Sequence, residues 1–282
     1  MGVSLLSPAL AHLKEFQPVA HTPIMTVMIA AVRKAARGVQ RDFGEVTNLQ
    51  ISVKGPGDFV TNADKRAEQI LREELLKARP SYGILGEEEA EHKGTDADHR
   101  FIVDPIDGTF NYMHALPLFA LTIALERKGE IVAGVTYNPI TDELFHAEKG
   151  TGAFVNNKRM RVAQRRELLD CMIATNLPSR GTKDHTTHRS QLTQMQVKTS
   201  GIRALGSTAM DMAYIAMGRL DGAWSDGLKA WDMAAGVLFI KEAGGFVVGI
   251  KGEANPLFSG GYIAGNADLL PQIRVVLDQA GK

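Results

Sequence analysis

The chain has 282 residues, and its 32 Lys and Arg are balanced by 32 Asp and Glu, so that the formal net charge is zero. With 44% apolar and 23% charged residues, it has the composition of a globular protein rather than of a disordered or fibrous one. A zero net charge argues against a protein that binds nucleic acid or an anionic membrane mainly through bulk positive charge.

Cys171 is the only cysteine, which excludes an intrachain disulfide framework and a multi-cysteine zinc site and fits a reducing compartment. It begins the apolar run 171–174, so we expect a buried thiol rather than a nucleophile. No apolar stretch reaches the roughly 18 residues of a membrane span. Residues 1–22 lack the pattern of a secretory signal, and we expect a cytoplasmic protein in which they form a loosely attached extension.

Apolar residues recur at helical spacing from Ile24 to Phe43, with basic residues between them, and predict an amphipathic helix. A Gly- and Pro-containing break follows at 54–57. Thr61, with Asp64 three residues later, forms the capping-box pattern of a second helix that ends near Ala78.

The pattern then changes to a period of two, which is typical of strands in a largely antiparallel sheet. The predicted strands are 101–104, 118–126, 131–137, 143–147 and 153–154, followed by a hairpin turn at Asn156-Asn157. The second half alternates strands with helices, which suggests an α/β layer. Its predicted strands are 172–175, 221–224, 246–250 and 262–264, and its predicted helices are 207–217, 232–243 and 268–280. We therefore expect two tightly joined subdomains, 23–150 and 151–282, after the extension 1–22.

The most informative stretch is 101–109, where an apolar strand ends at Asp104, a Pro-containing turn follows, and Asp107 precedes Gly108-Thr109. The turn can return Asp107 to the side of Asp104, and Gly108 and Thr109 offer backbone N–H groups. Two carboxylates beside amide donors are what a hard divalent cation and a phosphate require together. The same dipeptides are common in ordinary turns, so this stretch alone leaves both interpretations open.

Two further acids bear on that choice. Glu87 follows the apolar pair Ile84-Leu85, which places it at the end of a predicted strand rather than in a solvated charge run. Asp232 lies at the start of a predicted helix, between Trp231 and small residues that permit close packing, although an N-cap would have the same appearance.

Together these blocks resemble the inositol monophosphatase family of Mg²⁺-dependent, lithium-sensitive phosphatases. The similarity runs from about residue 24 to near the C-terminus, and the segments that carry it are 86–88, 104–109, 150–154, 201–203, 231–236 and 242–245. The resemblance implies an α+β or α/β fold of the sugar-phosphatase type, a layered αβαβα sandwich.

The resemblance also implies a metal site. Glu87 and Asp104, with the Ile106 carbonyl, would hold one Mg²⁺, and Asp104, Asp107 and Asp232 would hold a second. A third, weaker ion would lie near Glu87. Carboxylate and carbonyl oxygens suit Mg²⁺, whereas none of the eight scattered His residues forms the spaced pair of a zinc hydrolase.

The same resemblance assigns the catalytic roles. Thr109 and Glu87 would orient and deprotonate a metal-bound water, while Asp64 accepts a hydrogen bond from Thr109. Attack of this water on a phosphate monoester needs no covalent intermediate, because metal ions neutralise the phosphate oxygens and stabilise the leaving alkoxide. Asp64 has a capping role and a catalytic role, which do not exclude each other.

The substrate pocket is where the chain departs from the family pattern. Ser225 stands where many inositol-specific members have Glu, and Thr208 stands where Ala is usual. The substrate-binding residues that the resemblance implies are Asp107, Gly108, Thr109, Ser179, Gly206, Ser207, Thr208 and Ser225. These departures affect the identity of the alcohol more than the reaction.

We therefore predict a phosphomonoesterase that uses two to three Mg²⁺ ions and hydrolyses a small polyol phosphate, first inositol 1-phosphate. The alternatives are histidinol phosphate, fructose bisphosphate or a nucleotide 3′-phosphate, or a partner of the transcription machinery built on the same scaffold. By analogy with the family we expect a homodimer, with no membrane binding and no dedicated nucleic-acid binding.

Overall fold

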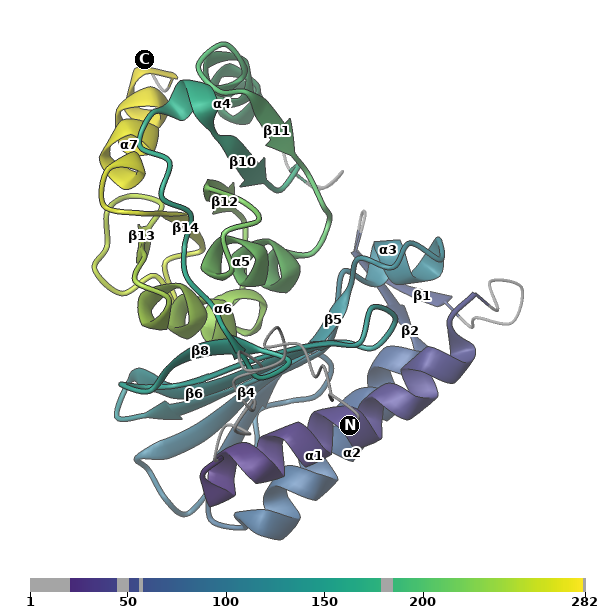
Figure 1. The fold of residues 1–282 in the computed structure, drawn as a ribbon. Helices are drawn as coiled ribbons and strands as arrows, with labels where there is room; N and C mark the ends of the chain where they lie inside the picture. Colours follow the sequence, from purple (N-terminus) through teal and green to yellow (C-terminus); the bar gives the residue numbers. More distant parts are fainter. Residues whose placement is uncertain (1–20, 45–50, 56–57, 179–184, 281–282) are drawn as a thin grey trace, which may run out of the picture.

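The computed structural model describes residues 21–44, 51–55, 58–178 and 185–280. They form a stack of alternating layers, helix, sheet, helix, sheet and helix (Figure 1). The predicted layered αβαβα sandwich is therefore confirmed. Among the helices of the described residues, none combines the length and the apolar character that crossing a bilayer requires.

The first layer consists of α1 (Pro23–Asp42) and α2 (Asn62–Ala78), which pack against each other and against one face of a seven-stranded sheet. Both helices were predicted, α1 from the spacing of its apolar residues and α2 from its capping-box pattern. The capping box of α2 is present, since the Thr61 hydroxyl accepts from the Asp64 amide and the Asp64 carboxylate accepts from the Thr61 amide.

The seven-stranded sheet has the order β3-β4-β5-β6-β7-β8-β9. Its strands are β3 (Gly83–Gly86), β4 (His99–Asp107), β5 (Ala120–Arg127), β6 (Glu130–Asn138), β7 (Glu143–Glu148), β8 (Gly152–Val155) and β9 (Lys158–Arg159). β3 is parallel to β4, and every other pair is antiparallel. Asn156 and Asn157 join β8 to β9 with φ of 44° and 65°, so the predicted hairpin turn is confirmed. The sheet thus continues to residue 159, and the subdomain boundary near 150 stays a prediction.

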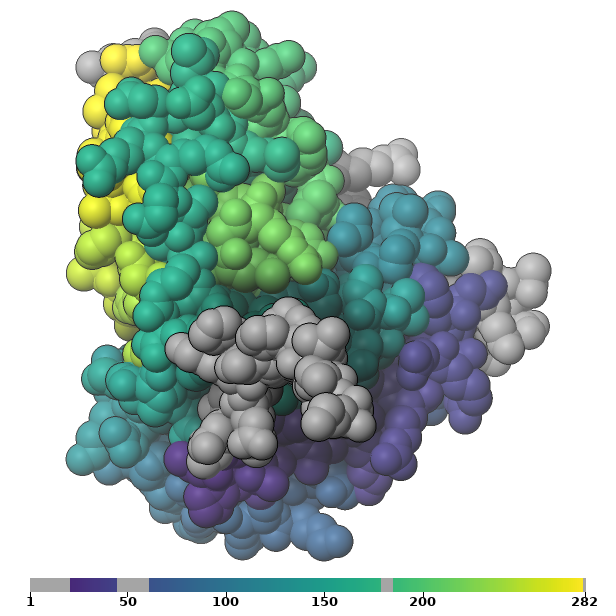
Figure 2. Space-filling model, in the orientation of Figure 1, coloured from purple at the N-terminus to yellow at the C-terminus, as the bar shows by residue number. Residues whose placement is uncertain are grey.

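The second sheet has the order β11-β10-β12-β14-β13, parallel on one side of β12 and antiparallel on the other. Its strands are β10 (Met172–Thr175), β11 (Gly201–Arg203), β12 (Gly222–Asp226), β13 (Phe246–Gly249) and β14 (Gly261–Gly265). The outer layer on this sheet is formed by α4 (Thr186–Gln196) and α7 (Leu269–Ala280), and a short 3₁₀ helix, η3 (Leu168–Asp170), precedes β10. In the space-filling view the second half of the chain, teal to green and yellow, sits on the first half, purple through blue to teal (Figure 2).

Cys171 lies just before β10 and is fully buried, as expected. Burial raises the pKa of its thiol to about 12. A thiol with this pKa is almost entirely protonated at neutral pH, which agrees with a structural rather than a nucleophilic role.

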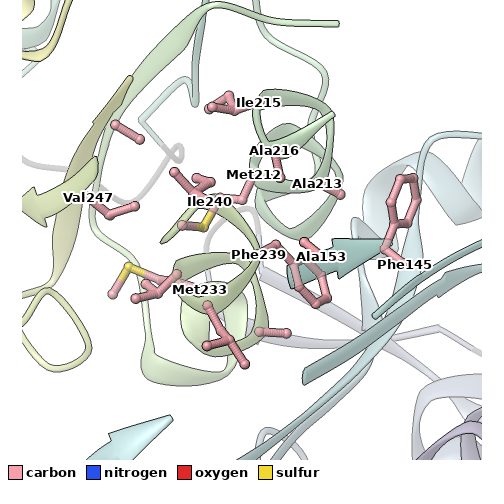
Figure 3. Packing of buried hydrophobic residues seen from close by; sticks show 14 of the residues in the cluster. Phe145, Ala153, Met212, Ala213, Ile215, Ala216, Met233, Phe239, Ile240 and Val247 are labelled. Carbon is pink, nitrogen blue, oxygen red and sulfur yellow. The ribbon is translucent and has the colours of Figure 1, made fainter. Parts of the chain in front are cut away.

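The middle layer is the helix pair α5 (Thr208–Ala216) and α6 (Ala230–Glu242), which contacts both sheets. One hydrophobic cluster extends from Phe145 and Ala153 of the first sheet, through both helices, to Val247 of the second (Figure 3). The helices approach closely because Gly236 faces Met212, whose Cβ would lie 2.5 Å from a Cβ at position 236. The small residues after Asp232 therefore serve the close packing that the sequence suggested.

Some elements were not predicted. β1 (Ile51–Gly55) and β2 (Asp58–Thr61) form an antiparallel hairpin around the break at 54–57. α3 (Thr109–Met113) is a single turn, β11 has three residues, and α4 buries only Met195. Such short or weakly amphipathic elements lack the apolar periodicity that predicts a helix or a strand.

Candidate metal centre

Asp104 and Asp107 lie at the end of β4, where the strand is irregular. Asp104 pairs with Thr122 and Asp107 with Ala120, so three steps along β4 match two along β5. Such a bulge redirects side chains, and here it brings both carboxylates to one side. The Asp104 carboxylate also accepts a hydrogen bond of 3.0 Å from the Ile106 amide.

Asp232 joins them from the helix layer. It is the third residue of α6, and its carboxylate accepts a hydrogen bond of 2.8 Å from the Lys229 amide. It is therefore not the N-cap of α6, a position that Lys229 occupies. Asp104, Asp107 and Asp232 each offer one oxygen, and these three atoms all lie within 4.8 Å of one another.

The three carboxylates are buried or half-buried, and their charges repel. Desolvation first, and then the charges of Glu87, Asp107, Asp232 and Asp64, raise the pKa of Asp104 well above its usual range. Desolvation raises the pKa of Asp107 to about 6, and desolvation with the Asp107 charge raises that of Asp232 to about 8. A divalent cation would neutralise these charges and take the oxygen ligands that Mg²⁺ prefers, so the residues present fit the metal that the resemblance implies.

Glu87 follows β3 directly, as predicted, and is half-buried. It does not belong to the cluster of three, yet its charge contributes to the raised pKa of both Asp104 and Asp232. The Glu87 carboxylate, in the loop that follows β3, therefore lies close enough to the cluster for its charge to act on two of the three acids.

Thr109 and Asp64 form a second group beside the cluster. The Thr109 hydroxyl oxygen lies 3.2 Å from the Asp64 carboxylate and 3.0 Å from the Ile106 carbonyl oxygen. Asp64 is fully buried and also accepts from the amide and the hydroxyl of Thr61. Desolvation raises its pKa, although these hydrogen bonds oppose the shift. The expected contact between Thr109 and Asp64 is present, and Asp64 both caps α2 and reaches the site.

Gly108 lies where the two halves of the molecule meet. Its φ of 95° is in the left-handed region, and a Cβ there would lie 3.1 Å from the carbonyl oxygens of both Gly206 and Leu118. Asn111 fixes this junction, because its amide nitrogen lies 2.7 Å from the carbonyl oxygens of Leu118 and Leu205. Sequence reasoning missed Asn111, since its partner Leu205 lies far along the chain.

Ser207, predicted to bind substrate, contacts Asp107. Its hydroxyl donates to the Asp107 carboxylate and accepts from the Met210 amide, which makes it the N-cap of α5. The Ala209 amide donates to the same carboxylate at 2.8 Å, and the Thr208 amide also contributes. The start of α5 thus holds a carboxylate that belongs to β4.

Two further residues, Ser225 and Ser179, were also predicted to bind substrate. Ser225 on β12 is buried, and its hydroxyl accepts a hydrogen bond of 3.2 Å from the Asn176 amide. Asn176 also exchanges side-chain hydrogen bonds with the Asp226 backbone. Ser179 lies outside the described residues. Sequence reasoning also missed Asp211 of α5, a buried acid near Asp107. Desolvation and the charge of Asp107 raise the pKa of its carboxyl group.

A model of the inositol monophosphatase family matches residues 20–279. The chain belongs to this family. The resemblance inferred from the sequence motifs is therefore confirmed.

Individual relatives agree with this assignment. The chain is 50% identical over 260 residues to "Inositol-1-monophosphatase" of Rhizobium meliloti (strain 1021), covering 92% of this chain and 98% of that one. It is 38% identical to "Nus factor SuhB" of Escherichia coli (strain K12), covering 86% and 91%. Among solved structures, the extragenic suppressor protein suhB of Bartonella henselae superimposes with a TM-score of 0.89 at 50% identity, covering 92% and 99%.

Proposed function

We propose that the protein is a Mg²⁺-dependent phosphomonoesterase whose substrate is a small polyol phosphate, most directly inositol 1-phosphate. The observation that carries this proposal is the juxtaposition of the buried cluster Asp104, Asp107 and Asp232 with the hydrogen-bonded pair Thr109 and Asp64. The printed name of the Rhizobium meliloti relative supports inositol 1-phosphate as the first substrate to test.

The residues that would hold two to three Mg²⁺ ions are Asp104, Asp107, Asp232, Glu87 and the Ile106 carbonyl. When bound, the ions supply Lewis-acid chemistry, neutralising phosphate oxygens and lowering the pKa of water. The protein contributes a buried, acidic and pre-arranged shell whose repulsion favours cation binding.

Thr109 and Asp64 would handle the proton of the attacking water. The Thr109 hydroxyl has one proton, which it can donate in a hydrogen bond to the Asp64 carboxylate or to the Ile106 carbonyl oxygen. Its lone pairs are then left to accept a hydrogen bond from a water. Burial makes the Asp64 carboxylate more basic, and it can take the proton that Thr109 passes on. This arrangement supports direct attack of water, without a covalent intermediate.

The substrate would lie between the two halves. On one side are the backbone amides of Gly108 and Thr109, and on the other is the start of α5 from Gly206 to Thr208. Ser225 and Ser179 would contact the alcohol. A pocket built on hydroxyl hydrogen bonds discriminates strongly between alcohols, so these residues would set specificity.

The experiment is a panel of phosphate esters assayed with Mg²⁺, with and without Li⁺. The panel includes inositol 1-phosphate, fructose bisphosphate, histidinol phosphate and a nucleotide 3′-phosphate. We expect phosphate release that is fastest from inositol 1-phosphate and is inhibited by Li⁺. Absence of phosphate release from every ester by folded protein would refute the proposal.

A partner function is a second candidate, favoured by the similarity to a protein named Nus factor SuhB. Asp104→Asn should abolish phosphate release while leaving binding to a transcription factor intact. Light scattering of the same samples tests the homodimer that we expect by analogy, and cell fractionation tests the cytoplasmic location.

A further inference from the structure

Among the candidate metal ligands, Glu87 differs in how it is held. Asp104 and Asp107 lie on β4 and Asp232 lies on α6, whereas Glu87 lies in the loop that follows β3. Its position therefore depends on what fixes that loop, because residues on loops are placed less rigidly than residues on helices and strands.

Two side chains of α2 bind the backbone of this loop. Glu68 is fully buried, and its two carboxylate oxygens accept from the amides of Glu88, at 2.8 Å, and Glu89, at 3.1 Å. Arg72 donates to the carbonyl oxygens of Glu89, at 3.1 Å, and Ala90, at 3.2 Å. The loop is thus bound through both its N–H and its C=O groups.

The two side chains also bind each other. Arg72 Nε donates to Glu68 at 2.8 Å, and both residues are buried, so their charges are removed from water together. A buried ion pair is a poor device for stability alone, because desolvation offsets much of the attraction, and an apolar pair would pack as well. Hydrogen bonds from charged groups, however, fix a backbone more strongly than neutral ones.

Gly86 shows how closely β3 lies on this pair. A Cβ at position 86 would lie 2.7 Å from Glu68 Cδ and 2.8 Å from an Arg72 guanidinium nitrogen. The end of β3, one residue before Glu87, therefore rests directly on the ion pair.

We propose that Glu68 and Arg72 are positioning residues that set the metal affinity of the site by holding Glu87 toward the carboxylate cluster. The proposal rests on the proposed function only in taking the cluster as a Mg²⁺ site. It predicts that loosening the pair weakens metal binding through Glu87 while the other ligands remain in place.

The test is calorimetric titration of the full chain with Mg²⁺, repeated with Mn²⁺ and electron paramagnetic resonance. Glu68→Gln, which keeps the shape but loses one acceptor and the charge, should raise the dissociation constant of one ion about tenfold. Arg72→Lys keeps the charge but loses the planar guanidinium group, which donates from more than one nitrogen. It should raise the dissociation constant less. In phosphate release, the Mg²⁺ concentration for half-maximal rate should rise, and excess Mg²⁺ should restore the maximal rate.

A double-mutant cycle separates positioning from a general loss of structure. If Glu68 acts through Glu87, Glu68→Gln should not weaken metal binding further in a Glu87→Gln background. Asp221→Asn is the matched control, because buried Asp221 likewise binds an arginine, Arg165, and a backbone amide, that of Met172, but at the start of β10.

The outcomes are distinct. Unchanged metal affinity in folded Glu68→Gln and Arg72→Lys, an equal loss in Asp221→Asn, or additive effects in the cycle would each overturn the proposal. Metal binding by a wild-type protein that hydrolyses no ester would refute the proposed function and leave this proposal standing.

Discussion

The two halves of the molecule bring different groups to the site and hold them in different ways. In the first half, main-chain features place three of the acids, since a bulged strand end carries Asp104 and Asp107 and a capping box carries Asp64. In the second half, a backbone amide holds Asp232, but side-chain contacts at element ends place the groups beside the proposed pocket. Ser207 binds Asp107 from α5, and Asn176 ties the end of β10 to β12.

This difference suggests a division of labour. A carboxylate fixed by backbone geometry keeps its position when neighbouring side chains change, whereas a pocket fixed by side-chain contacts changes with each substitution. The departures from the family pattern, at Thr208 and Ser225, both lie in the second half. We infer that the first half, together with Asp232 of α6, determines the reaction, and that the rest of the second half determines the alcohol.

The largest effect should come from the first half. Asp104→Asn should reduce phosphate release about a thousandfold or more, which corresponds to ~4 kcal/mol of transition-state stabilisation. The metal-free variant should be at least as stable as wild type in thermal unfolding, because one repelling charge is gone. Asp98→Asn, at an exposed acid of the loop before β4, is the control and should remain active. Activity of Asp104→Asn within tenfold of wild type would show that Asp104 is not essential.

Metal binding should change stability next most strongly. Mg²⁺ at a hundred times its dissociation constant should raise the free energy of unfolding by about 2.7 kcal/mol. Without metal, the raised pKa values of Asp107, about 6, and Asp232, about 8, mean that the folded state binds more protons than the unfolded state. Metal-free protein should therefore lose stability as the pH rises from 5 to 8, and Mg²⁺ should oppose this loss. Denaturant unfolding at both pH values measures it, and an increase in metal-free stability over that range would contradict the repulsion between the acids.

The contact between the halves should have a smaller effect. Ser207→Ala removes the N-cap of α5 and a donor to Asp107, and should lower the free energy of unfolding by about 1–2 kcal/mol. It should also weaken Mg²⁺ binding, which calorimetry can measure. Thr193→Ala removes an exposed hydroxyl that bonds within α4 and is the control. Equal stability of the two variants would mean that Ser207 does not join the halves.

The smallest effect should come from the edge of the proposed pocket. Asn176→Ala removes two side-chain hydrogen bonds to the Asp226 backbone, and should raise KM for the best ester by up to about tenfold, or ~1.4 kcal/mol. Steady-state kinetics across the ester panel should show altered preference among alcohols with an unchanged Mg²⁺ requirement. A changed Mg²⁺ requirement with unaltered preference would contradict the division between the halves.

Local signals account for what the sequence predicted correctly. Thr61 and Asp64 are three residues apart, Asn156 and Asn157 are adjacent, and α1 and α2 have clear apolar spacing, so each pattern lies within one element. The sequence block 104–109 likewise places two ligands on one strand end. The family resemblance was needed to bring Asp232 to them, because no local pattern records which distant elements meet.

The unpredicted parts depend on contacts between distant residues. Ser207 reaches Asp107 across 100 positions of the chain, and Asn111 reaches Leu205 across 94. Glu68 and Arg72, at i and i+4 on α2, have the spacing of an ordinary surface ion pair. Only the packing of β3 against them reveals that they are buried.

The helix pair between the two sheets has a consequence for folding. α5 and α6 belong to the second half and contribute to one hydrophobic cluster that includes residues of both sheets, so the first sheet cannot cover its inner face with the elements of its own half. A chain cut between β9 and β10 would leave the seven-stranded sheet with an exposed apolar surface. We expect this fragment to aggregate through that surface. The two halves should therefore unfold in a single cooperative transition, and chain synthesis must continue past α6 before the first sheet is fully covered.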